Sequence, residues 1–138
     1  MADVFTPEER SRVMSKVRGK DTKPEVLVRS LVHRMGFRFR LHNAKLPGKP
    51  DIVLKKHRKI IFVHGCFWHQ HPGCKHADRP TSNVDYWNRK LDRTIERDKN
   101  TMRSLKKNGW KVLIIWECET KNKQELLSVL KSFLSNEF

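Results

Sequence analysis

The chain has 138 residues, of which 37% are hydrophobic, and this length suits one compact domain better than two. Its 30 Lys and Arg residues outnumber the 15 Asp and Glu residues, so the formal net charge is +15 at pH 7. This charge disfavours basic partners and favours polyanions, with nucleic acid foremost. A basic, solvated surface without such a partner is the alternative interpretation of the charge alone.

The longest apolar runs, Ile60 to Val63 and Val112 to Trp116, are far shorter than the ~20 residues that cross a membrane as a helix. The first twenty residues contain no apolar signal-peptide core. We therefore expect no membrane partner and a cytoplasmic location. In that reducing compartment the three cysteines should be free thiols or metal ligands, because disulfides are rare there.

The N-terminal part of the chain contains two helix-start signals. The Thr-Pro-Glu-Glu segment at residues 6–9 predicts a helix over residues 7–18. Thr22 and Glu25 repeat the capping-box spacing and predict a second helix that ends at Gly36. The apolar face of this second helix comprises Val28, Leu31, Val32 and Met35. Glu25 lies one turn before that face, so its carboxylate either caps the helix or points toward the core.

Short apolar runs predict three strands in the next part of the chain. Residues 37–41 alternate Phe and Leu with Arg, which is the period of a half-buried strand. Residues 52–54 follow Asp51 directly, and the basic segment 55–59 should connect them as a hairpin to a third strand, residues 60–63. The positive charge at this turn is most simply a solvated surface.

Residues 64–80 have neither a helical nor a strand period, yet they contain histidines, cysteines and large aromatic residues. A long amphipathic helix is predicted from about 83 to 108, with Asp98 on its apolar stripe. An apolar strand at 112–116 and a final helix at about 122–134 follow. These elements predict an α/β domain with a central mixed sheet flanked by helices.

Three cysteines and one histidine have the composition of a zinc site. They are Cys66, His71 and Cys74 in the loop, with the spacing Cys-x4-His-x2-Cys, and Cys118 after the last predicted strand. A closed set of three thiolates and one imidazole is typical of structural, tetrahedral Zn²⁺. Such an ion would order the loop. His69 or His76 could replace His71, and free thiols, or a catalytic zinc with water in place of Cys118, are further alternatives.

A second group of titratable residues suits phosphodiester hydrolysis, which needs a hard cation, a base that activates water and a proton for the leaving oxygen. Its members are Glu25, Asp51, His64, His69 and Asp98. Carboxylates suit Mg²⁺, and imidazoles transfer protons near neutral pH. In the predicted hairpin Asp51 lies beside Val63 and His64, and Val63 would contribute only its backbone carbonyl. Each residue alone has a structural explanation, but their convergence favours a site.

Phe67 and Trp68 are adjacent large apolar residues between two presumed zinc ligands, where a core position for both is hard to arrange. On a cationic protein such side chains can insert between bases. Trp87 and Met14 could join them, although each also fits the apolar face of its own helix as an ordinary core residue.

Together these residues resemble the very-short-patch repair (Vsr) mismatch endonuclease family. The resemblance is carried by Phe62 to His69 (FVHGCFWH), Leu46 to Asp51 (LPGKPD), Trp87, Glu96 to Asp98 and Trp116 to Cys118. It extends over nearly the whole chain and implies a restriction-endonuclease-like, three-layer fold with a central mixed sheet, flanking helices and a zinc-bound loop. The second carboxylate and the lysine of the usual restriction-type site are here Phe62 and His64.

The resemblance implies a Mg²⁺-dependent, strand-specific endonuclease of very-short-patch mismatch repair. Such an enzyme nicks DNA 5′ to the thymine of a T:G mismatch that arises by deamination of 5-methylcytosine. The implied Mg²⁺ ligands are Asp51 and the Val63 carbonyl. His69 would be the general base, His64 and Asp98 would position water and phosphate, and Glu25 would orient the histidines.

The resemblance also implies roles in DNA binding and in structure. The implied structural zinc ligands are Cys66, His71, Cys74 and Cys118. Phe67, Trp68 and Trp87 match a major-groove wedge carried by the loop 64–80, and Met14 matches a minor-groove contact on an N-terminal helix, residues 1–20. A wobble T:G pair is easier to unstack than a matched pair, so a wedge would favour mismatched DNA.

We further expect a nucleoid-associated monomer whose partners are double-stranded DNA with a T:G mismatch and mismatch-repair proteins. The main rival is a catalytically inactive, zinc-dependent DNA-binding module, which would have no need of Asp51, His69 and Asp98. A restriction-type nuclease with a relaxed mismatch preference is the second rival.

Overall fold

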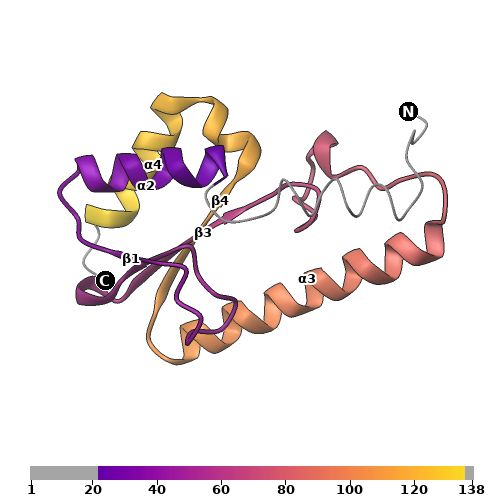
Figure 1. Cartoon of the computed structure of the whole chain (residues 1–138), viewed down its shortest axis with the longest axis horizontal. Helices are drawn as coiled ribbons and strands as arrows, with labels where there is room; N and C mark the ends of the chain where they lie inside the picture. Colours follow the sequence, from indigo (N-terminus) through magenta and orange to yellow (C-terminus); the bar gives the residue numbers. More distant parts are fainter. Residues whose placement is uncertain (1–21, 136–138) are drawn as a thin grey trace.

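The computed structural model describes residues 22–135. The predicted N-terminal helix and Met14 lie outside the described residues. Within residues 22–135 four strands form one sheet in the order β1-β2-β3-β4, with three α-helices around it. The strands are β1 (Arg40–Leu41), β2 (Ile52–Leu54), β3 (Lys59–His64) and β4 (Lys111–Trp116). The helices are α2 (Lys23–Arg34), α3 (Val84–Lys107) and α4 (Lys123–Ser135). Helices α2 and α4 cover one face of the sheet and α3 lies along the other (Figure 1).

The sheet is mixed, as predicted. Strands β1, β2 and β3 pair in antiparallel fashion, whereas β3 and β4 pair in parallel. The β2–β3 connection is a 3₁₀ turn at Lys55–His57, followed by Arg58 in the left-handed region at φ 55°. The predicted strand at residues 37–41 is shorter than expected. Only Arg40 and Leu41 pair, with Val53 and Ile52, whereas Phe37 and Phe39 pack against the core outside the ladder.

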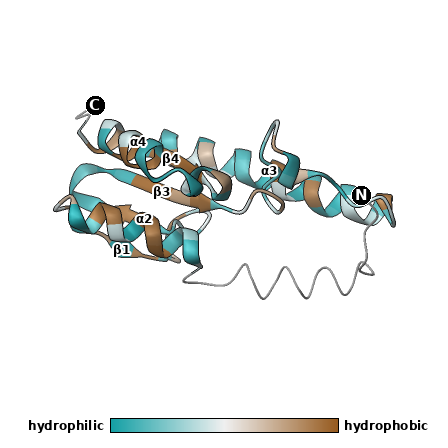
Figure 2. Ribbon diagram, turned by 90° about the horizontal axis from the view of Figure 1, so that it is seen from above, coloured by the Kyte–Doolittle hydropathy of each residue, from teal (hydrophilic) through white to brown (hydrophobic). Residues whose placement is uncertain are grey.

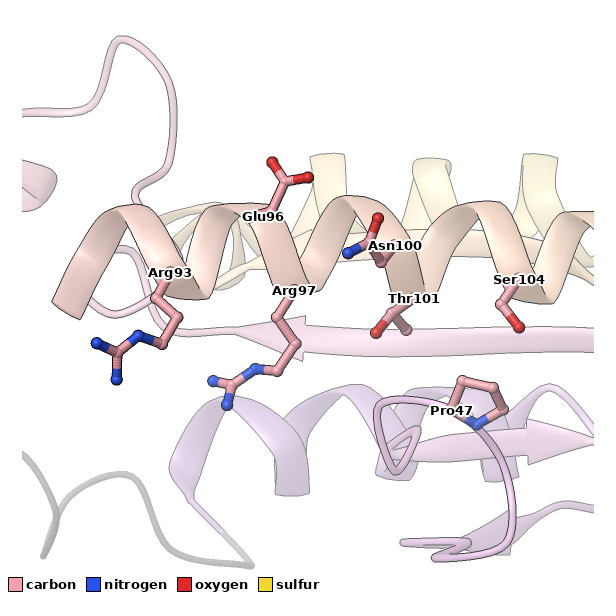
Figure 3. A pocket seen from close by; sticks show the side chains of 7 residues that line it. All are labelled: Pro47, Arg93, Glu96, Arg97, Asn100, Thr101 and Ser104. Carbon is pink, nitrogen blue, oxygen red and sulfur yellow. The ribbon is translucent and has the colours of Figure 1, made fainter. Parts of the chain in front are cut away.

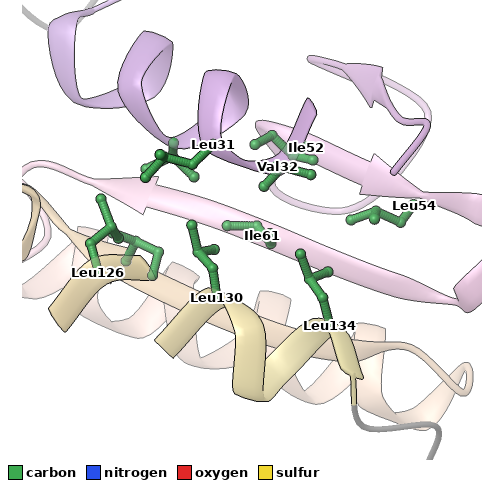
Figure 4. Close-up of a cluster of buried hydrophobic side chains, with 10 residues drawn as sticks. Leu31, Val32, Ile52, Leu54, Ile61, Leu126, Leu130 and Leu134 are labelled. Atoms are coloured by element: carbon green, nitrogen blue, oxygen red, sulfur yellow. The ribbon is translucent and has the colours of Figure 1, made fainter. Parts of the chain in front are cut away.

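The larger core lies between the sheet and helices α2 and α4 (Figure 4). Thr22 caps α2 by accepting a hydrogen bond from the Glu25 N–H, and Gly36 follows the helix at φ 89°. The predicted apolar face of α2 is confirmed, since Val28, Leu31 and Val32 are buried. Their partners are Ile52, Leu54, Ile61 and Ile115 on the strands and Leu126, Leu130 and Leu134 on α4. Each such fully buried side chain stabilises the fold by roughly 1.5–3 kcal/mol.

The second core lies between the sheet and α3. Phe62, Val53 and Ile60 point to this side and pack with Leu105 and Trp110. β3 therefore has apolar residues on both faces, and β3 and β4 are largely hydrophobic in Figure 2. Helix α3 continues beyond the sheet toward the loop that follows β3 (Figure 1). This extension brings α3 residues to the predicted site.

Contrary to the prediction, the basic hairpin segment 55–59 is not entirely solvated, because Lys59 is buried. Only 3% of this residue is exposed, and its Nζ donates hydrogen bonds to the carbonyl oxygens of Phe133 (2.7 Å) and Leu134 (3.3 Å). Those carbonyls belong to the last turn of α4, where a positive charge complements the helix dipole. Lys59 thus joins the start of β3 to the end of α4.

Candidate active site and metal centre

Asp51 and Val63 meet where β2 begins and β3 ends. Oδ2 of Asp51 accepts a hydrogen bond of 2.7 Å from the Val63 N–H. The β2–β3 register pairs Ile52 with Ile61, and extending it by one position places Asp51 opposite Phe62. The sequence pattern predicted Asp51 beside residues 63 and 64, one residue out of register. The carboxylate nevertheless reaches the Val63 backbone.

The Asp51 carboxyl is a weaker acid than usual. Burial, with a smaller contribution from the nearby Glu25 charge, raises its pKa to about 6, against the opposing effects of the Val63 hydrogen bond and of the charges of His42 and His69. The side chain is 18% exposed. A cation bound beside this carboxyl would lower its pKa, because a positive charge favours the ionised form.

A second cluster brings together His64 from the end of β3, His69 from the loop and Asp98 from the middle of α3. Nδ1 of His69 lies 2.7 Å from Oδ2 of Asp98. The His64 ring stacks on the His69 ring with centroids 3.8 Å apart and planes 9° apart. Burial, and then the charge of His69, lower the pKa of His64 to about 3. His64 is therefore neutral near pH 7, and His69 is held by a carboxylate partner.

Glu25 lies in a third cluster, with His42 and Asp51. Oε2 of Glu25 is 3.6 Å from Nε2 of His42, and Oδ1 of Asp51 is 3.9 Å from Nδ1 of the same ring. Glu25 is only 9% exposed, so its side chain points inward, which was one of the two alternatives. The histidine beside it is His42, which the sequence patterns did not single out. Pairing the predicted strand 37–41 against 52–54 would have revealed it, because that pairing places residue 42 opposite Asp51.

Four sulfur and nitrogen donors converge beside the end of the sheet. The potential ligand atoms of Cys66, His71, Cys74 and Cys118 all lie within 4.8 Å of one another. Nδ1 of His71 is 3.7 Å from the Cys66 sulfur and 3.4 Å from the Cys118 sulfur. The parallel ladder pairs His64 with Trp116 and so places Cys66 and Cys118 side by side. His71, rather than the alternatives His69 and His76, belongs to this group.

The donor set fits a metal ion of zinc type. Three thiols and one imidazole can surround a tetrahedral ion with no position left for water. Burial raises the pKa of Cys66 to about 12, so this thiol stays protonated in the absence of a cation. A bound metal would convert it to a thiolate. The His71 ring also stacks on Trp116, with centroids 4.3 Å apart, which fixes its orientation.

Phe67, Trp68, Trp87 and Leu91 form a separate buried cluster. Phe67 and Trp68 are each 6% exposed and Trp87 is fully buried, so the expectation that a core position for both Phe67 and Trp68 is hard to arrange is wrong. The long helix α3 supplies the missing partners, because its N-terminal half extends under the loop. The Lys90 ammonium lies 4.9 Å from the centre of the Trp68 ring.

A groove of about 420 Å³ runs between α3 and the loop that precedes Asp51. Pro47 forms one wall, and the α3 side is mostly polar (Figure 3). Arg93 and Arg97 project to the same side of the helix, whereas Glu96 points to the other side. Arg97 directly precedes Asp98, so the groove lies next to this carboxylate. The groove lining includes no residue of the two histidine–carboxylate clusters or of the cysteine cluster.

Sequence comparisons identify the known proteins that this chain resembles. The family model described as "DNA mismatch endonuclease Vsr" matches residues 2–76, more than half of the chain. The chain belongs to this family. The matched segment contains Asp51, His64 and His69 together with three of the four metal-type ligands, whereas Asp98 and Cys118 lie beyond it. The protein is therefore a DNA endonuclease, a hydrolase whose partner is DNA.

Curated relatives match nearly the full chain. The type II nicking enzyme V.XorIIP of Xanthomonas oryzae pv. oryzae is 45% identical over 134 residues, which are 97% of this chain and 98% of the relative. The type II nicking enzyme V.NmeAIP of Neisseria meningitidis serogroup A is 48% identical over 89% of this chain and 87% of the relative. The DNA mismatch endonuclease Vsr of Escherichia coli K12 is 39% identical over 91% of this chain and 80% of the relative.

Within residues 22–135, no helix is long and apolar enough to cross a membrane.

Proposed function

We propose that this Vsr-family endonuclease is Mg²⁺-dependent and nicks one strand 5′ to the thymine of a T:G mismatch produced by deamination of 5-methylcytosine, in very-short-patch repair. The observation that carries the proposal is that the His69–Asp98 pair lies close enough to Asp51 for the charge of His69 to act on the Asp51 carboxyl, at the end of the sheet where Asp51 contacts Val63. An inactive DNA-binding module would have no need of this arrangement.

Asp51 and the Val63 carbonyl would hold the Mg²⁺. The Val63 N–H already points to Asp51, and in a β-strand the N–H and C=O of one residue point to the same edge. The Val63 carbonyl therefore opens toward the Asp51 carboxylate, just before the start of β2. When bound there, Mg²⁺ would polarise the phosphate and stabilise the negative charge of the transition state.

His69 would accept the proton of the attacking water. An ionised Asp98 can only accept a hydrogen bond, so in this contact it would accept from Nδ1–H and leave Nε2 as the basic nitrogen. His64 stays neutral because its pKa is about 3, so it can stack on His69 without opposing a positive charge there. His64 and Asp98 would then set the position of His69, and through it the position of water relative to the phosphate.

The Cys66, His71, Cys74 and Cys118 cluster would bind structural Zn²⁺. Its first two members flank Phe67, Trp68 and His69 in the sequence. An ion that links this loop to Cys118 would fix the general base relative to Asp51 and Asp98. It would also hold the loop backbone at Phe67 and Trp68, so that DNA recognition and cleavage depend on the same rigid loop.

The DNA surface would combine charge with an aromatic wedge. The net charge of +15 supplies affinity that does not depend on sequence, and Arg93 and Arg97 in the α3 groove would contact phosphates of the strand next to the cleavage site. Phe67, Trp68 and Trp87 would form the wedge. Because these rings are buried among themselves, insertion requires part of the cluster to leave its packing, and a weakly stacked T:G pair would lower that cost. Met14 would act from the minor-groove side.

The proposal extends to the architecture and context. We propose a restriction-endonuclease-like fold in a single domain over residues 1–138, and the layers α2/α4, sheet and α3 support this proposal. We propose that the protein acts as a monomer in the cytoplasm on nucleoid DNA, together with mismatch-repair proteins.

The proposed function can be tested with a panel of end-labelled duplexes. The zinc-loaded protein is incubated with each of the possible mismatches, in several flanking sequences, with and without Mg²⁺. The expected result is a nick 5′ to the thymine of T:G duplexes only when Mg²⁺ is present. Equal nicking of all mismatches would favour a relaxed specificity, and binding without cleavage in every context and with every divalent ion would refute the proposal.

A further inference from the structure

Trp116, the last residue of β4, lies between the cysteine cluster and the His64–His69 pair. Side chains alternate along a strand, so Trp116 points to the same face of the sheet as Val112 and Ile114, which is the face that α3 covers. The parallel ladder pairs Trp116 directly with His64, the last residue of β3. The two side chains are therefore neighbours at the same end and on the same face of the sheet.

The Trp116 ring contacts one histidine on each side. His71 of the cysteine cluster stacks on it, with centroids 4.3 Å apart and planes 11° apart. The His64 ring meets it edge-on, with centroids 5.3 Å apart and planes 73° apart. His64 stacks in turn on His69 at 3.8 Å and 9°. Four rings thus form one continuous series from the cysteine cluster to the proposed general base, and both stacked and edge-on geometries are favourable.

His64 depends on these ring contacts for its orientation. Its Nδ1 atom is buried and has no hydrogen-bond partner within residues 22–135. The rings around it are Trp116, His69 and Phe62, the last with its centroid 5.4 Å away. Removal of the Trp116 ring would leave one side of His64 without its contact, and His64 is the surface on which His69 stacks.

Trp116 is itself held in place through its backbone. Its N–H donates a hydrogen bond of 2.8 Å to Oε1 of Glu119, in the short 3₁₀ helix Glu117–Lys121 that follows β4. Cys118, a member of the cysteine cluster, lies in the same turn. An ion held by Cys118 and His71 would therefore fix the indole twice, through the chain and through the ring stack.

We propose that Trp116 is a positioning residue of the nicking reaction, which rests against His71 of the zinc cluster and holds the His64–His69 pair in the orientation that cleavage requires. The inference rests on the proposed function, because it needs His69 to act as the general base. Trp116 acts through His64 and does not itself contact the substrate. A small displacement of His64 would move His69 relative to the phosphate, and reaction rates depend steeply on such distances.

Two purely structural roles fit the same contacts. In the first, Trp116 shields the metal ligands from water, and in the second it fills the end of the core below α3. Either role predicts that substitution lowers zinc content or stability. Neither role predicts a change in the His64–His69 stack in protein that remains folded and loaded with zinc.

The test uses the full-length, zinc-loaded protein. Trp116→Leu and Trp116→Met keep an apolar side chain but remove the flat ring, whereas Trp116→Phe keeps a flat ring. The matched control is Trp110→Leu, because Trp110 directly precedes the other end of β4 and packs in the second core with only 8% of its surface exposed. Zinc content and thermal unfolding establish which of these proteins are folded.

Two quantities are measured for each folded protein. The first is the nuclear Overhauser effect between the ring protons of His64 and His69, recorded without DNA, which rings stacked at 3.8 Å produce. The second is the single-turnover nicking rate of a T:G duplex in Mg²⁺, at enzyme concentrations that saturate binding. DNA affinity is measured separately, so that an effect on the rate is distinguished from an effect on binding.

In the folded ringless variants the His64–His69 signal should disappear, and the nicking rate should fall by about 100-fold, the cost of a small misplacement of a reacting group. DNA affinity should change little. Trp116→Phe and Trp110→Leu should keep both the signal and the rate. If neither ringless variant is folded, Trp116→Phe decides, since it must keep both. The inference is overturned by a folded ringless variant with unchanged signal and rate, or by a Trp116→Phe protein that keeps the signal but loses the rate.

Failure of this inference is distinguishable from failure of the proposed function. Ringless variants that lose the ring signal but nick at the wild-type rate refute the positioning role and leave the proposed function standing. A wild type that nicks no T:G duplex refutes the proposed function, whereas the ring signal still decides whether Trp116 orients His64 and His69.

Discussion

His69 and Asp98 face each other from the loop that follows β3 and from helix α3, with Nδ1 of the imidazole 2.7 Å from Oδ2 of the carboxylate. The contact joins two segments that are 29 positions apart in sequence. A carboxylate that accepts the Nδ1 proton selects the tautomer whose Nε2 is basic. The stack of His64 on the other side of the ring limits rotation. Asp98 is therefore expected to act on catalysis through His69.

Asp98→Asn should slow cleavage while leaving DNA binding almost unchanged. The amide cannot stabilise a positively charged His69, and it can donate to Nδ1 and select the wrong tautomer. We expect the single-turnover rate to fall by about 100- to 10,000-fold, the range of general acid–base contributions. Asp92→Asn is the matched control, since Asp92 is on the same helix, is 64% exposed and pairs with Arg79. Equal rates for the two variants would show that Asp98 has no such role.

Cys118→Ser should remove the metal and destabilise the fold. Cys118 is the donor that ties the loop to the end of β4, and a structural zinc contributes directly to the free energy of unfolding. We expect about one zinc per chain in the wild type by elemental analysis, and much less in the variant. The loss of unfolding free energy should clearly exceed the ~0.5 kcal/mol that is typical of surface substitutions.

His76→Gln, an exposed histidine of the same loop, should keep both the zinc and the stability. Normal stability of metal-free wild-type protein would contradict the structural role of the cluster.

Asp51→Asn should stabilise the protein at neutral pH when no divalent cation is added. The pKa of Asp51 is raised in the folded state from 3.8 to about 6, so the folded state binds this proton more tightly than the unfolded state. Its ionisation therefore lowers stability as pH rises from about 4 to about 6. The asparagine oxygen can still accept the Val63 hydrogen bond, and we expect a gain of at most about 3 kcal/mol at pH 7.

Chemical denaturation of the zinc-loaded wild type and Asp51→Asn between pH 4 and pH 8 measures this difference. The gain should vanish near pH 4, where the wild-type carboxyl is also protonated, and Mg²⁺ should reduce it at pH 7. A difference that does not change with pH would contradict the assigned shift.

The groove between α3 and Pro47 should bind backbone phosphates. Replacing both Arg93 and Arg97 by Gln should weaken binding to matched and mismatched duplexes alike, because phosphate contacts carry no sequence information. The slope of log affinity against log salt should become shallower by about 0.9 for each phosphate that the variant no longer neutralises, or roughly 2 for the pair. Arg34→Gln, an exposed residue at the end of α2 on the other side of the sheet, is the control. An unchanged slope in the double variant would exclude the groove from the DNA surface.

The fold was predictable where a long apolar period exists. Helix α3 spans 24 residues and matches the predicted range within one residue at each end, because Trp87, Leu91 and Leu105 recur at helical spacing. The strand at 37–41 was overestimated because its alternation reflects packing, not pairing. Phe37 and Phe39 pack against the core from outside the ladder. A local pattern reports burial, whereas strand length also depends on the partner strand.

The sequence predicted which residue types make up the candidate site, but not which of these residues lie in contact with one another. The spacing of the cysteines identified a metal-type cluster, although only the three-dimensional arrangement separates His71 from His69 and His76. Glu25 was singled out, but its neighbour His42 was missed, because that contact depends on the register of two short strands. Burial of Phe67 and Trp68 was missed for a similar reason, since it depends on how far α3 extends past the sheet.

The central claim is that Asp51 supports metal-dependent nicking of T:G-mismatched DNA. Its most direct test is the single-turnover nicking rate of a T:G duplex in Mg²⁺, measured with wild-type protein and with Asp51→Asn at enzyme concentrations that saturate binding. The expected result is strand-specific nicking by the wild type, and loss of nicking with retained binding in the variant. Nicking by Asp51→Asn at the wild-type rate, or no nicking of any T:G duplex by metal-loaded wild type, would contradict the claim.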